Sequence, residues 1–186
     1  MPVSLAGNAG GSPKGALIPI AYYAVSGTST NNIYFSNIPQ GYQDLMLVIN
    51  ARSSYASTTA QAYTYINNDS TFLYSQTRLY GNGSSAVSDR TSGGLLYLGE
   101  IPAATSTSGI FGSSVNHFMN YANTSTYKTI LTRSAVDLNG SGLVHLWAQL
   151  YRSTNAITIL SCYNTTGANW VAGTTFSLYG IRSIGQ

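Results

Sequence analysis

The side chains that most often carry acid–base or nucleophilic chemistry are scarce in this chain. It has two histidines, His117 and His145, and one cysteine, Cys162. Neither histidine stands in a recognisable catalytic motif, and no Gly-x-Ser-x-Gly nucleophile elbow occurs. His145 alternates with Trp147 along an apolar run, where a packed or interfacial histidine is commoner than a general base. We therefore expect no catalytic residues and a protein that is not an enzyme.

The acidic residues do not suggest a catalytic pair or a metal site. They are well separated along the chain, so their spacing does not indicate the pair of carboxylates that a glycosidase needs. The segment 67–70, Asn-Asn-Asp-Ser, offers several oxygen atoms but a single carboxylate, and calcium prefers more. An Asx-type turn is the favoured interpretation. One cysteine and two distant histidines give no zinc spacing, so we expect no metal and no cofactor.

The string Gly81-Asn-Gly-Ser-Ser-Ala86 matches the short form of a dinucleotide-binding loop. That function needs a helix directly after the string and an acidic residue about 20 positions later. No helical pattern follows here, and Asp89 is too near. The string is therefore predicted to be the loop of a β-hairpin.

Charge is the most unusual feature of the composition. Hydrophobic residues make up 44 % of the 186 residues, enough for a core, but charged residues only 7 %. A typical soluble domain has roughly 25 %. The net charge is +3, yet the basic residues are scattered, so no nucleic-acid-binding face is expected. Because surface charge keeps monomers soluble, the deficit favours a protein covered by copies of itself.

The sequence shows no targeting or membrane signal. No charged segment followed by an apolar one marks a signal peptide at the N-terminus. No apolar run approaches 18 residues, so no membrane insertion is expected. The single cysteine excludes an intramolecular disulfide. We expect synthesis in the cytoplasm.

The periodicity predicts one all-β domain with an extended arm. Residues 1–15 are rich in Gly, Ala and Ser and form the predicted N-terminal arm. From residue 16 to 186 the dominant period is two, which is typical of strands. No capped amphipathic helix is apparent. We therefore predict an antiparallel β-sandwich or jelly roll of about ten strands. The predicted strands cover residues 17–25, 31–36, 44–52, 60–67, 72–80, 94–100, 109–119, 126–136, 142–152, 156–163 and 174–182.

Two of these segments read as central strands. Segment 44–52 is apolar on both faces for much of its length, and Arg52 is expected where its second face meets water or a partner. Segment 143–152 puts Val144, Leu146, Ala148 and Leu150 on one side and an aromatic, polar series on the other. Its leucine spacing also allows a helix, but the flanking glycines and the aromatic residues favour a strand.

Tyrosine is the remaining signal, with 15 copies. Tyrosine joins a large apolar ring to a polar tip, which suits the rim of a sandwich, a subunit contact or a sugar-stacking platform. All three interpretations stay open. The residues predicted to make subunit or ligand contacts are Tyr22, Tyr63, Tyr65, Tyr74, Tyr80, Trp147 and Tyr151.

An ordered series of segments resembles small virion proteins encoded by tailed bacteriophages, including phages of cyanobacteria. The resemblance covers about residues 17 to 182. It implies a β-sandwich virion component, with no catalytic residues to transfer onto this chain. The segments that carry it are Ile33–Leu45, Asn50–Ser53, Leu79–Ala86, Glu100–Ala104, Asn120–Tyr121, Asn155–Thr158 and Gly173–Ile181.

These observations lead to a functional hypothesis and two alternatives. The leading one is a non-enzymatic structural protein of the virion, either a capsid decoration (cement) protein or a small tail component. Its partners would be other copies of itself, by family analogy in a homotrimer, and phage capsid or tail proteins. The first alternative is a receptor-binding or glycan-binding tail adhesin that contacts a host-surface glycan. The second is an enzyme acting on the cell envelope.

Overall fold

The structure is a computed structural model that describes residues 16–27, 30–165 and 167–182. The predicted arm, residues 1–15, lies outside the described residues. The described chain contains no helix, and hence none that could cross a membrane. Its strands are β1 Leu17–Ala24, β2 Asn32–Phe35, β3 Asp44–Ala51, β4 Thr59–Ile66, β5 Tyr74–Gly81, β6 Ala86–Gly93, β7 Leu96–Pro102, β8 Gly112–Phe118, β9 Lys128–Asp137, β10 Gly142–Tyr151, β11 Leu160–Asn164 and β12 Thr175–Ile181.

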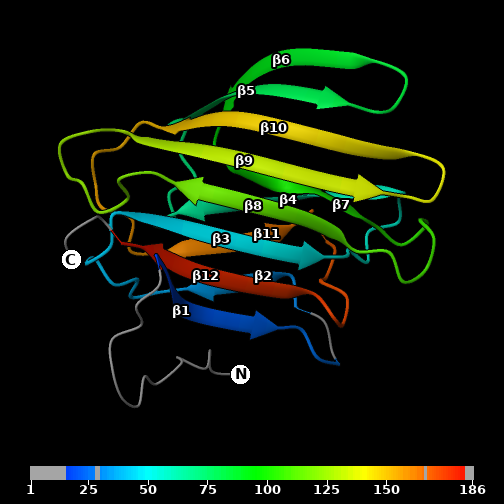
Figure 1. Cartoon of the computed structure of the whole chain (residues 1–186), viewed down its shortest axis with the longest axis horizontal. Helices are drawn as coiled ribbons and strands as arrows, with labels where there is room; N and C mark the ends of the chain where they lie inside the picture. The colour runs from blue at the N-terminus through cyan, green and yellow to red at the C-terminus, as the bar shows by residue number, and fades with distance from the viewer. Residues whose placement is uncertain (1–15, 28–29, 166, 183–186) are drawn as a thin grey trace.

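The strands form two antiparallel sheets packed face to face, which confirms the predicted all-β sandwich (Figure 1). The larger sheet has eight strands in the order β1-β12-β3-β8-β9-β10-β5-β6. The smaller has four in the order β2-β11-β4-β7. Whether the connectivity is that of a jelly roll stays a prediction. Because one sheet has twice as many strands, part of the larger sheet extends past the smaller one.

The core lies between the sheets and follows the predicted period of two. On β3, Leu45, Leu47 and Ile49 are all fully buried. They face Ala62, Ile66 and Leu160 among other residues of the smaller sheet. The segment 44–52 is central as predicted, because β3 pairs with β12 on one side and β8 on the other.

The prediction for Arg52 is wrong. Its side chain meets neither water nor a partner, because the loop between β7 and β8 folds over the end of β3. The guanidinium donates to the carbonyl oxygens of Ser106, Thr107 and Ile110, each at 2.9 Å. These carbonyls replace water around the charge, so Arg52 is 8 % exposed.

The predicted turns lie where the chain reverses. Asn139 and Gly140 both have positive φ and join β9 to β10, as expected for a two-residue hairpin turn. The string 81–86 is a hairpin turn between β5 and β6, and the Asn82 side chain accepts the backbone N–H groups of Ser84 and Ser85. At residues 67–70 the Asp69 carboxylate accepts the Thr71 N–H at 2.9 Å, which confirms the Asx turn.

Two strand predictions need correction. The segment 86–93 was not predicted, yet it forms β6 along the whole of β5. The segment 156–163 starts too early, because β11 begins at Leu160. The preceding Ile157 and Ile159 instead donate their N–H groups to the Tyr121 carbonyl and to the Asn67 side chain. Loop contacts thus satisfy the backbone that was expected to pair in a sheet.

Candidate functional site

The predicted contact residues separate into four places. Tyr22 is 52 % exposed on the edge strand β1. Tyr63 and Tyr65 lie on the outer face of the smaller sheet. Tyr74 and Tyr151 are in the core. Tyr80 and Trp147 lie where the larger sheet extends past the smaller one.

Tyr74 and Tyr151 are buried, so the prediction that they meet a partner or ligand is wrong. They are 2 % and 1 % exposed and stack with ring centroids 4.9 Å apart. Their hydroxyls donate to the backbone oxygen and the carboxylate of Asp69. Burial raises the pKa of Tyr74, and it raises the pKa of Tyr151 to about 12. This stack anchors the turn that passes from one sheet to the other.

Tyr63 and Tyr65 belong to a cluster on the outer face of the smaller sheet. The tyrosine cluster consists of Tyr34, Tyr63, Tyr65 and Tyr163. The rings of Tyr63 and Tyr163 are stacked at 5.5 Å, and Tyr65 meets Tyr163 edge-on at 5.2 Å. Burial, together with the hydrogen bond to Tyr34, raises the pKa of Tyr163 to about 12. Tyr34 and Tyr163 join the cluster because their strands β2 and β11 pair beside β4. The sequence prediction did not include these two residues.

The outward surface of the larger sheet over β8, β9, β10 and β5 is called here the outer sheet face, and its large exposed side chains include three apolar ones. Val144, Leu146 and Leu79 are 65 %, 41 % and 52 % exposed. Leu146 lies directly opposite Leu79, and Val144 opposite Ala135. Solvent-facing positions of an antiparallel sheet are normally polar. A contiguous apolar surface on a sheet is typical of a contact with another protein.

Arg133 is the charged residue at the centre of the outer sheet face, and Asp137 lies at the end of β9 on the same side. Arg133 on β9 lies between Val115 of β8 and Leu146 of β10. It forms no ion pair with the described residues. Arg90 on β6 is exposed at the rim. The face is therefore apolar with a positive centre.

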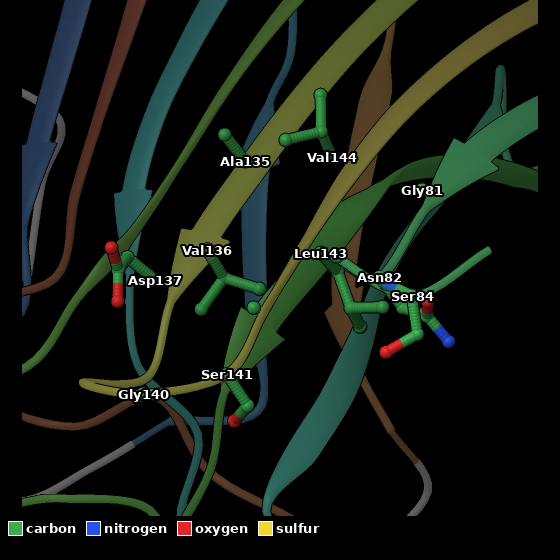
Figure 2. Close-up of a pocket in the computed structure, with 12 residues that line it drawn as sticks. Gly81, Asn82, Ser84, Ala135, Val136, Asp137, Gly140, Ser141, Leu143 and Val144 are labelled. Atoms are coloured by element: carbon green, nitrogen blue, oxygen red, sulfur yellow. Dashed lines mark hydrogen bonds between the residues drawn. The ribbon is translucent and has the colours of Figure 1, made fainter. Parts of the chain in front are cut away.

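A hollow of about 600 Å³ adjoins one end of the outer sheet face (Figure 2). It opens where the β9–β10 turn and the β5–β6 turn approach each other. Val136, Leu143 and Val144 line it from the strands, and Asn82 and Ser84 from the loop. Asp137 is the one ionisable residue in its lining. The hollow is suited to packing against another surface and has no set of groups for catalysis.

The inward face of β5 and β6 forms a second concave region, called here the β5–β6 cleft. It holds a cavity of about 120 Å³. Five strands contribute to its lining, which consists of Gln61, Gln76, Arg78, Asp89, Thr91, Tyr97 and Trp147. Of these residues, Trp147 was predicted from the sequence, and the polar ones were missed. Nothing in the local sequence marks them, because the cleft is created by pairing and by the overhang of the larger sheet.

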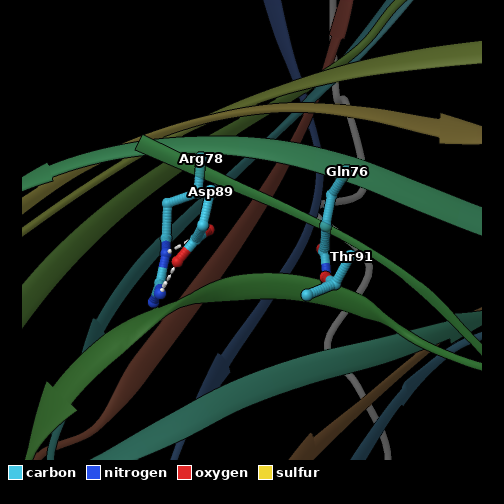
Figure 3. A network of polar contacts seen from close by, with 4 residues as sticks. All are labelled: Gln76, Arg78, Asp89 and Thr91. Atoms are coloured by element: carbon cyan, nitrogen blue, oxygen red, sulfur yellow. Dashed lines mark hydrogen bonds and ion pairs between the residues drawn. The ribbon is translucent and has the colours of Figure 1, made fainter. Parts of the chain in front are cut away.

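Two cross-strand pairs define the polar surface of the cleft (Figure 3). Arg78 donates to both carboxylate oxygens of Asp89, which lies opposite it, and this hydrogen bonding lowers the pKa of Asp89. In the next pair on the same face, two residues along each strand, the Gln76 amide donates to the Thr91 hydroxyl at 2.8 Å. The Arg78 guanidinium also lies over the Tyr80 ring, 4.4 Å from its centroid.

Burial shifts the pKa values of two ionisable groups beside the cleft towards their neutral forms. His145 packs between Tyr80 and Trp147, with centroid distances of 5.2 and 4.5 Å. Burial and the nearby Arg78 lower the pKa of His145 to about 4. Neither imidazole nitrogen has a hydrogen-bond partner among the described residues. Burial also raises the pKa of Glu100, although a hydrogen bond from Thr59 opposes this shift.

The other residues that suggested chemistry have structural contacts. His117 Nε2 lies 2.8 Å from Asp44 Oδ2, and Asp44 Oδ1 accepts the Asn120 N–H. This contact ties β3 to the β8–β9 turn. Burial raises the pKa of the Cys162 thiol to about 12, which suppresses the nucleophilic thiolate. The described residues contain no group of three or more side chains able to hold a metal ion.

Comparisons with family models, with curated proteins and with solved structures found no match for this chain. The fold and the arrangement of the surface residues are therefore the basis for the functional proposal.

Proposed function

We propose that this protein is a non-enzymatic structural component of a bacteriophage particle that assembles with copies of itself through the outer sheet face. The observation that carries the proposal is the apolar surface around Val144, Leu146 and Leu79. The phage assignment rests on the sequence resemblance. Within the particle, a capsid decoration protein or a small tail component is the proposed role.

The energetics of the outer sheet face favour association. Burying apolar surface contributes roughly 25 cal/mol per Å² before the costs of association are subtracted. The same face has few charged groups to desolvate, so little of this gain is lost. The low charge of the whole chain, 7 % of residues, fits a molecule whose surface is covered in its working state.

The charge of the face bears on its symmetry. In a two-fold dimer the same patch meets itself, and if the axis passes near the centre of the face, Arg133 of one copy approaches Arg133 of the other. Repulsion between these like charges disfavours that arrangement. A heterologous contact, in which the face meets a different surface of the next copy, avoids the clash and can close into a ring. This supports the proposed homotrimer over a dimer.

The test is the mass of the purified full-length chain in solution, measured by light scattering after size exclusion. We expect a species of three chains for the wild type and a single chain for the double variant Val144→Asp, Leu146→Asp. Phe72 is 77 % exposed outside the face, so Phe72→Asp is the matched control and should remain a trimer. A monomeric wild type, or a trimer that survives the double substitution, would contradict the proposal.

The location is tested separately on particles. Antibodies against the chain should label particles purified from infected host cells, as seen by electron microscopy. Mature particles that carry no copies would contradict the virion assignment, whatever the oligomeric state.

A further inference from the structure

The β5–β6 cleft has features that self-association does not explain. It lies on the inward side of the larger sheet, opposite the outer sheet face. Strand β7 is the last strand of the smaller sheet and packs on β8 and β9, so β5 and β6 continue past the edge of that sheet (Figure 1). An inward surface would ordinarily bury apolar residues. Here its centre is formed by Gln76, Arg78, Asp89 and Thr91.

Several polar groups in the cleft are left with unused hydrogen-bonding capacity. The Gln76 Oε1 atom is sealed from solvent and has no partner among the described residues. The Thr91 hydroxyl accepts from Gln76, and its own O–H makes no hydrogen bond within the described chain. Arg78 uses two of its five N–H groups on Asp89. A buried polar atom without a partner is costly, so Gln76 favours a ligand group that donates a hydrogen bond. Arg78 and Thr91 are accessible to solvent and can donate to the same ligand.

The charge balance of the cleft selects the kind of ligand. Arg78 and Asp89 neutralise each other, so the site has no net charge to attract a phosphate or a carboxylate. The other polar groups, from Gln61, Gln76 and Thr91, are uncharged. A neutral ligand dense in hydroxyl groups matches this set, because each hydroxyl both donates and accepts.

Aromatic rings form the other wall. The rings of Tyr97 and Trp147 are nearly parallel, with an interplanar angle of 17° and centroids 6.4 Å apart. Trp147 is 3 % exposed and packs against Tyr97, so the partly exposed Tyr97 ring offers the apolar surface to the C–H groups of a sugar ring, beside the polar groups that bind its hydroxyls. The cavity of about 120 Å³ is far smaller than the roughly 300–1,000 Å³ typical of sites for larger ligands. It suits one sugar residue.

We propose that the β5–β6 cleft binds a neutral saccharide by a single sugar residue, with Gln76, Thr91 and Arg78 bonding its hydroxyls and Tyr97, supported by the buried Trp147, packing against its ring. The cleft is complete within one chain. Binding therefore does not require the self-association proposed above.

The experiment is saturation-transfer NMR on the full-length protein with glucose, galactose, mannose, rhamnose and N-acetylglucosamine, and with glucuronic acid as an acidic probe. We expect transfer to at least one neutral sugar and a weaker signal from glucuronic acid. Gln76→Leu should weaken the bound sugar by about tenfold, because it removes the amide that faces the cavity. Thr91→Val is a second variant should the first fail to fold.

Two control variants locate the binding. Tyr65→Ala alters the tyrosine cluster and should leave the affinity unchanged. The double variant Val144→Asp, Leu146→Asp should also bind, which separates this inference from the proposed assembly. Absence of transfer to every neutral sugar would overturn the inference. So would preference for glucuronic acid, or loss of binding in Tyr65→Ala with full binding in Gln76→Leu.

Discussion

Strands β3 and β10 belong to one sheet, yet they distribute polarity in opposite ways. On β3 the inward residues Leu45, Leu47 and Ile49 are apolar and fully buried. On β10 the inward series includes His145 and Gln149, both 3 % exposed, while Val144 and Leu146 face outward and are exposed. Both strands alternate with a period of two.

The difference follows from what covers each strand. Strand β3 lies under the smaller sheet, and its inward face meets apolar side chains there. Strand β10 lies near the edge of that sheet and continues into the overhanging β5 and β6. There the inward face borders a cavity and the outward face is free to meet another molecule. Alternation of apolar and polar residues specifies that a strand has two different faces. The position of the smaller sheet decides which of these faces becomes the core.

The largest effect should come from removing a core side chain of β3. Leu47→Ala should lower the free energy of unfolding by about 3–5 kcal/mol, because it leaves a cavity between the sheets. Leu79→Ala, on the outer sheet face, should lower it by less than about 0.5 kcal/mol in the monomer. Urea unfolding followed by circular dichroism measures both. Equal costs for the two leucines would show that the outer sheet face is not exposed in a single chain.

Most of the strands and turns could be predicted from the sequence, because apolar alternation and turn-forming residues are local features of the chain. The exception, β6, shows the limit. Its residues, Ala86–Gly93, read AVSDRTSG and carry no apolar alternation on either face. The strand exists because the turn at Asn82 returns the chain along β5, and its inward face needs no core residues where the smaller sheet is absent.

The candidate sites were less accessible. Tyr63 and Tyr65 could be grouped because they are two residues apart on one strand. Their neighbour Tyr163 joins them only through the pairing of β11 with β4. The β5–β6 cleft likewise draws Gln61 and Tyr97 from the smaller sheet to meet Arg78 of the larger one. Proximity of this kind depends on sheet order, which the spacing of residues along the chain does not encode.

The next effect concerns His145, and it depends on pH. Its folded pKa of about 4 lies below the ordinary 6.5, so the unfolded chain takes up this proton first as the pH falls. The contribution of neutral His145 to stability is complete above pH 6.5 and is lost between about pH 6.5 and 4. The shift corresponds to about 3 kcal/mol. His145→Phe should remove this loss.

The measurement is urea unfolding of wild type and His145→Phe at several pH values from 7 to 4. Glu100 acts in the opposite direction, because its raised pKa means that its ionisation costs stability as the pH rises. Its effect is shared by both proteins and cancels in their difference. A difference that does not change with pH would mean that the imidazole has the same pKa in the folded and the unfolded protein, and that the inward face of β10 is wetter than the structure indicates.

The smallest effect concerns Gln76, which lies on the part of the larger sheet that extends past the smaller one. Gln76→Leu removes a sealed amide oxygen without a partner but also loses the hydrogen bond to Thr91. An unpaired buried polar group costs about 1–3 kcal/mol and a typical hydrogen bond contributes about 1 kcal/mol, so the variant should be more stable by up to about 2 kcal/mol. Leu47→Gln, the reverse change under the smaller sheet, should be strongly destabilising. If Gln76→Leu is less stable than the wild type, the amide is retained for folding. If it is more stable but no longer binds sugar, the amide is retained for a ligand.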